Sequence, residues 1–178
     1  TCAVNHLGYF LFTNLLLDLV NKESESRIIN VSSAAHHFVK GMQWDDINYK
    51  DDFKMGLKAY GQSKLGNILF TKQLAKKLQK DGVTVNAIHP GGVNTSLGNQ
   101  NNSLLGRVLK IILKPFFRSP LKGANTIIYL AEIDGLSITG AYWVDGRVAK
   151  TSHYSKNEAE AEKLWRLSEK LVNQEFDI

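Results

Sequence analysis

Short β-branched segments that end in polar residues alternate in this sequence with helical patterns. Arg27–Ser33 and Val83–His89 are the two clearest such segments, and Ala141–Val144 is a third candidate. Buried strands that alternate with amphipathic helices favour a parallel sheet that is covered on both faces. We therefore predict an α/β fold, in which ligands bind at the carboxyl ends of the strands.

Apolar residues at intervals of three and four separate these strands. They predict helices over Asn5–Val20 and Leu57–Lys80, the second with a polar face rich in lysine. Ser119-Pro120 is typical of a helix N-cap, and it leads into a helix over Ala124–Glu132. Ser155, with a glutamate three residues later, has the spacing of a capping box and predicts the start of a last helix. Residues 1–178 are interpreted as a single, partial domain.

The composition narrows the class of protein. The only cysteine, Cys2, excludes an internal disulfide and indicates a reducing, intracellular compartment. The net charge of +5 fits a mildly basic solvated surface, and it leaves open an anionic partner such as a membrane surface or a phosphorylated cofactor. Zinc-finger spacing and aromatic residues interleaved with basic ones are both missing, which argues against nucleic-acid binding, and we assign no residue to a metal.

Tyr60 and Lys64 are four residues apart in a helical pattern, so their side chains lie on one face. A nearby ammonium stabilises a phenolate, which lets a tyrosine exchange a proton with a carbonyl or alcohol oxygen. A hydroxyl such as that of Ser33 can hydrogen-bond the same oxygen. These groups suit the interconversion of ketones and alcohols by a hydride carrier. Each of these features alone has a simpler explanation. The tyrosine–lysine spacing also occurs on surface helices, and serines commonly end strands. Asn5, a further candidate, could be a helix cap.

Four motifs, taken together and in order, give a more specific indication. They resemble motifs of the short-chain dehydrogenase/reductase family, and they are Val4–Phe10, Arg27–Ser33, Tyr60–Leu65 and His89–Thr95. Three further segments resemble the retinol dehydrogenase branch of that family, namely Ser33–His37, Lys64–Thr71 and Lys163–Ser168.

The resemblance implies a role for each site residue. Tyr60 would be the general acid/base, and Lys64 would tune it and hydrogen-bond the nicotinamide ribose. Asn5 would hold a water in a proton relay. Ser33 would orient the substrate oxygen, and because side chains alternate along a strand, Ser32 would face away from the cleft. The residues that would border the nicotinamide are Pro90, Gly91, Val93 and Thr95.

The resemblance also implies a doubly wound, Rossmann-like sheet, of which this chain supplies roughly strands five to seven. The activity implied is hydride transfer between NADP(H) and a lipophilic alcohol, aldehyde or ketone, with NAD left open. The family's glycine-rich phosphate-binding turn has no counterpart before Asn5, so we expect a catalytic half that is inactive alone. The alternative is a truncated, non-catalytic fragment that acts as an interaction module through an exposed flank.

The segment Ser103–Arg118 is apolar and carries basic residues at intervals of three and four. In the family a mobile lid over the substrate follows the proline–glycine motif. We therefore expect a lid that lines a lipophilic pocket and rests peripherally on a membrane, while the alternative is a helix packed on the core. The resemblance favours the endoplasmic reticulum or mitochondrion, and the sequence leaves the oligomeric state open, a homo-oligomer included.

Overall fold

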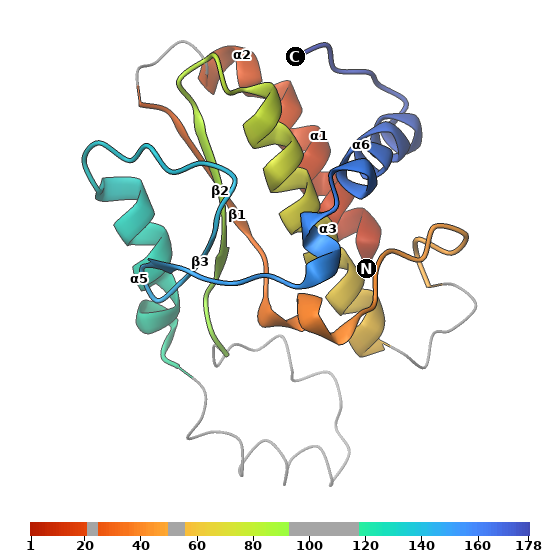
Figure 1. The fold of residues 1–178 in the computed structure, drawn as a ribbon, viewed down its shortest axis with the longest axis horizontal. Coiled ribbons are helices and arrows are strands. Elements are labelled where there is room, and N and C mark those ends of the chain that lie inside the picture. The colour runs from red at the N-terminus through yellow and green to blue at the C-terminus, as the bar shows by residue number, and fades with distance from the viewer. Residues whose placement is uncertain (21–24, 50–55, 93–117) are drawn as a thin grey trace, which may run out of the picture.

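The computed structural model describes residues 1–20, 25–49, 56–92 and 118–178. A mostly parallel sheet in the order β1-β2-β3-β4 lies between α5 on one face and α1, α3 and α6 on the other (Figure 1). The strands are β1 (Arg27–Val31), β2 (Thr84–His89), β3 (Tyr142–Val144) and β4 (Arg147–Val148). This arrangement confirms the predicted α/β fold.

The three predicted strands pair in parallel, and one short strand was not expected. β1 pairs with β2 and β2 with β3 in parallel, whereas β4 pairs antiparallel with β3. β4 has two residues, too few to show any alternation in sequence. Among the described strands, β1 forms one edge of the sheet.

The helical segments follow the predicted pattern with different bounds. The π-helical turn η1 (Ala3–Leu7), α1 (Gly8–Leu15) and α2 (Leu17–Val20) together replace the single predicted N-terminal helix. The remaining elements are η2 (Ala34–Phe38, 3-10), α3 (Gly56–Lys77), α5 (Pro120–Glu132), η6 (His153–Lys156, 3-10) and α6 (Glu158–Val172). Within the described ranges, no helix has the length and apolar character that a bilayer crossing requires.

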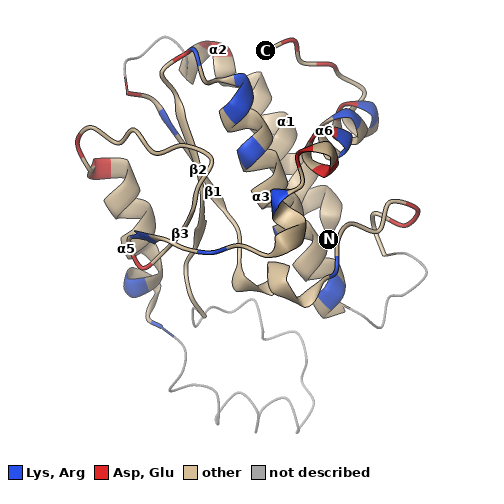
Figure 2. Ribbon diagram, in the orientation of Figure 1, with Lys and Arg blue, Asp and Glu red and all other residues tan. Residues whose placement is uncertain are grey.

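α3 is the centre of the molecule, and it is buried on more sides than its sequence indicates. All residues from 61 to 71 are buried, because η1, η2, α6 and the sheet surround this part of the helix. Of the lysines on the predicted polar face, Lys58 in the first turn of α3 and Lys76 near its C-terminal end are exposed, whereas Lys64 is buried. Figure 2 shows the basic residues along α3. Polar residues of α3 are therefore held in the interior, where each needs a hydrogen-bond partner.

Aromatic rings fill the core between α1, α3 and α6. Phe10 lies edge-on to both Phe70 and Trp165, with ring centroids 5.5 and 4.9 Å apart. On the opposite face of the sheet, Leu130 of α5 packs against Ile88 and Trp143. Both faces of β2 are thus covered, as expected for a parallel sheet.

One predicted helix start is confirmed and another is wrong. The Ser119 side chain accepts a hydrogen bond from the Lys122 amide, as expected of an N-cap. Ser155 does not cap the last helix, because it lies inside η6 and its hydroxyl donates to the Ser152 carbonyl. Asn157 is the cap instead, and its side chain accepts from the amide of Glu160. Asparagine is as good a cap as serine, and it lies directly before the helix.

Candidate active site

The ammonium group of Lys64 lies against the end of β1. Its Nζ donates to the Val31 carbonyl at 3.0 Å, and the side-chain amide nitrogen of Asn67 donates to the same oxygen at 3.1 Å. Burial of the Lys64 side chain lowers its pKa. Nζ lies 5.5 Å from the centroid of the Tyr60 ring. The tyrosine and the lysine predicted to act together therefore share one face of α3.

The two serines after β1 have different surroundings. Ser32 is buried, its hydroxyl donates to the Lys64 carbonyl at 2.8 Å, and its amide donates to the Ile88 carbonyl at 2.8 Å. Ser33 is less buried and caps η2, since its hydroxyl oxygen accepts from the Ala35 amide at 3.2 Å. Ser32 thus joins β1 to β2 and α3, while the Ser33 hydroxyl keeps its hydrogen for another partner.

Asn5 is connected to the first turns of α3. It lies in η1, and its amide nitrogen donates to the Ser63 hydroxyl at 3.1 Å. That hydroxyl in turn donates to the Tyr60 carbonyl at 2.7 Å. π-helical turns are rare and often occur at functional sites. Asn5 is therefore linked through Ser63 to the backbone carbonyl of Tyr60, and its predicted relay water stays a prediction.

Gly61 brings the turn that carries Ser33 close to the helix that carries Tyr60. A Cβ atom at Gly61 would lie 2.6 Å from the Ala35 carbonyl oxygen, closer than real Cβ contacts allow. Only glycine at this position lets η2 approach α3 without displacement.

The end of β2 forms the neighbouring part of the site. The His89 Nδ1 accepts from the Ala34 amide at 3.4 Å, which places this strand end beside η2. Gly91 has a φ of +83°, and a Cβ there would meet the Arg118 side chain at 2.7 Å. Arg118 forms a two-pronged ion pair with Asp145. The positive φ at Gly91 favours glycine, and because glycine has no side chain, none covers the backbone at this position.

The donor set fits the nicotinamide half of a dinucleotide. The buried ammonium of Lys64 has hydrogens beyond the one given to Val31, and Pro90 and Gly91 follow β2 at the carboxyl edge of the sheet. The described residues do not include a glycine-rich turn that leads into a helix and could hold the phosphates. Val93, Thr95 and residues 103–117 of the predicted lid lie outside the described residues.

Sequence reasoning missed three residues that support this site. Ser63 and Asn67 each follow a predicted site residue by three positions, so helical spacing could have found them. His36 contacts Ser33 through its ring, and nothing in the sequence pattern indicates that contact.

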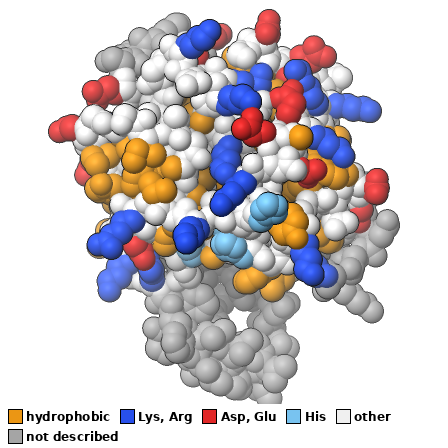
Figure 3. All heavy atoms as spheres, in the orientation of Figure 1, with side chains coloured by type: hydrophobic (Ala, Val, Ile, Leu, Met, Phe, Trp, Pro, Cys, Tyr) orange, Lys and Arg blue, Asp and Glu red, His pale blue; other side chains and the backbone are white. Residues whose placement is uncertain are grey.

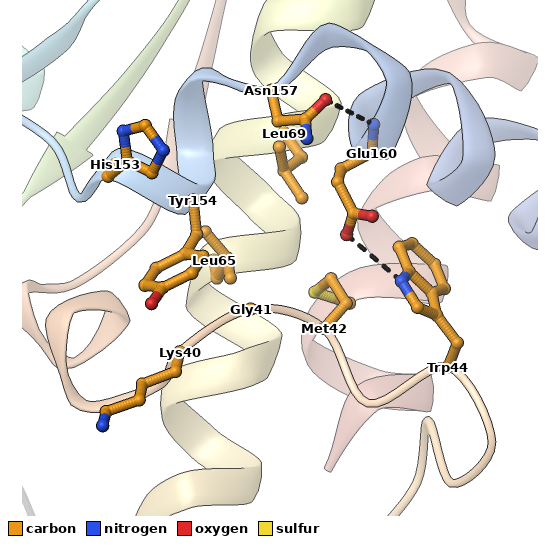
Figure 4. Close-up of a pocket in the computed structure, with 10 residues that line it drawn as sticks. All are labelled: Lys40, Gly41, Met42, Trp44, Leu65, Leu69, His153, Tyr154, Asn157 and Glu160. Carbon is orange, nitrogen blue, oxygen red and sulfur yellow. Dashed lines mark hydrogen bonds between the residues drawn. The ribbon is translucent and has the colours of Figure 1, made fainter.

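A separate cavity of about 360 Å³ lies between the loop 40–44, α3 and η6 (Figure 4). Trp44 and Tyr154 point into it, and the Trp44 indole donates to the Glu160 carboxylate at 3.1 Å. The predicted site residues are not among those that line this cavity. The η6 residues that line this cavity, His153 and Tyr154, come directly after Ser152. The backbone amide of Ser152 donates a hydrogen bond to the His36 ring.

Comparison with known proteins identifies the class. Residues 1–146 match a family model described as enoyl-(acyl carrier protein) reductase, which belongs to the short-chain dehydrogenases. An uncharacterized protein from Mycobacterium paratuberculosis has a structure that aligns with a TM-score of 0.72 and 29% identity, covering 99% of this chain and 60% of that one. The chain therefore belongs to the short-chain dehydrogenase/reductase family.

Within that family the chain is similar to retinol dehydrogenases. Retinol dehydrogenase 14 of Mus musculus is 41% identical over 175 residues, which cover 96% of this chain and 51% of the relative. A chloroplastic short-chain dehydrogenase, TIC 32 B of Brassica napus, is 40% identical over 181 residues, covering 96% and 56%. The chain thus spans about half the length of the curated relatives it matches.

Proposed function

We propose that this chain is the catalytic half of an NADP-dependent oxidoreductase that acts on a lipophilic alcohol, aldehyde or ketone. The observation that carries the proposal is the buried ammonium of Lys64, which lies beside the Tyr60 ring and is fixed by the end of β1. Family membership supports hydride transfer, and the names of the relatives support a retinoid-like substrate. The activity belongs to the full-length protein that contains these residues.

Each proposed residue handles the proton or the substrate oxygen. The cofactor, when bound, supplies or accepts the hydride at the reacting carbon. Tyr60 donates a proton to the carbonyl oxygen in reduction and accepts it from the alcohol in oxidation. Lys64 stabilises the phenolate form with its nearby charge. Ser33 donates its free hydroxyl hydrogen to the same substrate oxygen, and Asn5 holds the relay water and, through Ser63, the second turn of α3.

Lys64, Tyr60 and the backbone at Pro90 and Gly91 would hold the nicotinamide ribose and ring. The residues that select NADP over NAD belong to the region around the phosphate-binding turn in this fold. Structures with this fold include Pseudomonas aeruginosa RhlG in complex with NADP, at 24% identity and a TM-score of 0.61. Our choice of NADP follows the retinol dehydrogenase branch. We further propose an intracellular protein that contacts a membrane peripherally through residues 103–118.

Assays of the full-length protein test this function. With NADPH and all-trans-retinaldehyde, Tyr60→Phe should lower turnover by about 10²- to 10⁴-fold, because the phenolic hydroxyl supplies the proton. Its melting temperature should stay within error of the wild type. Tyr129→Phe, at an exposed position on α5, is the matched control and should keep full turnover. NADH and a small water-soluble aldehyde, run in parallel, report the cofactor and substrate preference.

Two results would count against the proposal. Near-normal turnover by Tyr60→Phe would remove the tyrosine from the mechanism. A folded full-length protein without hydride transfer from either cofactor would favour the alternative, a non-catalytic interaction module.

A further inference from the structure

His36 uses both of its ring nitrogens, and its partners fix one tautomer. The fully buried ring places Nδ1 2.6 Å from the Ser33 carbonyl oxygen and Nε2 3.2 Å from the Ser152 amide nitrogen. A backbone N–H can only donate, so Nε2 must be the acceptor. Because a neutral imidazole carries a single N–H, that hydrogen is on Nδ1 and is donated to Ser33.

The surroundings keep the ring neutral. Burial lowers the pKa of His36 to about 4, and the nearby His37, His89 and Lys72 act in the same direction, while the hydrogen bond to Ser33 opposes them. On the face of the molecule shown in Figure 3, histidine side chains lie beside Lys or Arg side chains. The Tyr142 ring packs edge-on against His36, with centroids 5.1 Å apart. At neutral pH the ring therefore holds one position and one tautomer.

The contacts of His36 converge on Ser33. The Ser33 carbonyl accepts from the His36 amide at 3.2 Å as well as from the ring. The Ser33 hydroxyl oxygen accepts from the Ala35 backbone amide, so the carbonyl and the hydroxyl of Ser33 are both held within one turn. On its other side the ring is anchored to Ser152, directly before η6. Ser33 is thereby connected to a segment more than a hundred positions away in the sequence.

We propose that His36 is a positioning residue for Ser33, which rests on the proposed function in which Ser33 orients the substrate oxygen. His36 holds the Ser33 backbone between β1 and η6, and so sets the direction of the hydroxyl. It does not touch the reacting atoms itself. A displacement of about 1 Å in such a group can lower turnover by about 10²-fold.

Two isosteric substitutions in the full-length protein separate the two contacts. In His36→Asn the amide nitrogen lies near the place of Nδ1 and retains the donor to Ser33, whereas the bond to Ser152 is lost. In His36→Gln the amide oxygen lies near the place of Nε2 and retains the acceptor for Ser152, whereas the bond to Ser33 is lost. We expect His36→Gln to lower kcat about tenfold and His36→Asn by less than about threefold, with cofactor KM unchanged.

The exposed neighbour His37 provides the control, since His37→Gln should leave kcat unchanged. A double-mutant cycle shows whether His36 acts through Ser33. In a Ser33→Ala background, His36→Gln should cause no further loss of kcat. The same fold-loss in both backgrounds, or equal kcat in His36→Asn and His36→Gln, would overturn the proposal.

A spectroscopic measurement decides the inference even if the proposed function fails. If Tyr60→Phe retains its turnover, the proposed function is wrong. The tautomer of His36 can still be determined by ¹⁵N NMR of the histidine ring, which does not depend on activity. The Nδ1–H form at neutral pH, with a Ser33 carbonyl ¹³C shift that changes in His36→Gln and not in His36→Asn, supports the positioning contact. An Nε2–H form overturns it.

Discussion

The two strand ends that build the candidate site are held in different ways. At the end of β1, buried side chains of α3 bond to backbone carbonyls, as Lys64 and Asn67 do to Val31. At the end of β2, the contacts are the His89–Ala34 hydrogen bond and, beside Gly91, an ion pair between Arg118 and Asp145, whose side chains are 37% and 54% exposed.

The difference separates a rigid part of the site from an adjustable one. A buried ammonium that loses its partner is left with a large desolvation cost, so the Lys64 contact fixes the geometry of α3 and β1. An exposed ion pair contributes little to stability and is screened by salt. We infer that the groups proposed for proton transfer are preorganised, whereas the wall proposed for the nicotinamide is held more loosely.

The largest effect is expected at Lys64. In the full-length protein, Lys64→Met should lower turnover by about 10²-fold, because the phenolate loses its stabilising charge. The activity–pH profile for alcohol oxidation should move to higher pH, and cofactor binding should weaken. Lys76→Met, at an exposed position of the same helix, is the control. Profiles and affinities that coincide for the two variants would show that Lys64 has no special role.

A smaller effect is expected where α3 meets η2. Gly61→Ala places a Cβ against the Ala35 carbonyl, and it should destabilise the chain by about 1–3 kcal/mol. Gly56→Ala, in the first turn of the same helix, meets nothing within 4 Å and should be near neutral. Chemical denaturation of both variants measures the difference. If Gly61→Ala is as stable as Gly56→Ala, this contact is not rigid and the comparison of the two strand ends fails.

The smallest effect is expected at the end of β2. Arg118→Ala should lower the free energy of unfolding by less than about 1 kcal/mol, and the loss should shrink further in high salt. Melting temperatures at low and high ionic strength measure it, with Lys122→Ala in the exposed first turn of α5 as the control. A salt-independent loss larger than that of Gly61→Ala would reverse the ranking of the two regions.

Local patterns were sufficient where a residue's role depends on its immediate neighbours. The β-branched runs gave the three parallel strands, and the spacing of Tyr60 and Lys64 placed them on one face of α3. Ser119-Pro120 predicted a real N-cap. The cap at Ser155 was predicted wrongly, because this serine lies inside η6 and Asn157, directly before α6, is the cap instead.

The sequence by itself determined the family, the strands and the helix that carries the tyrosine and lysine, because alternation and helical spacing are local properties of a chain. Only the tertiary structure decided that Lys64 bonds the end of β1, that η2 approaches α3 over Gly61, and that the His36 ring joins Ser33 to Ser152. These contacts join segments that are distant in sequence. Their geometry depends on how helices and sheet pack, which no local pattern records.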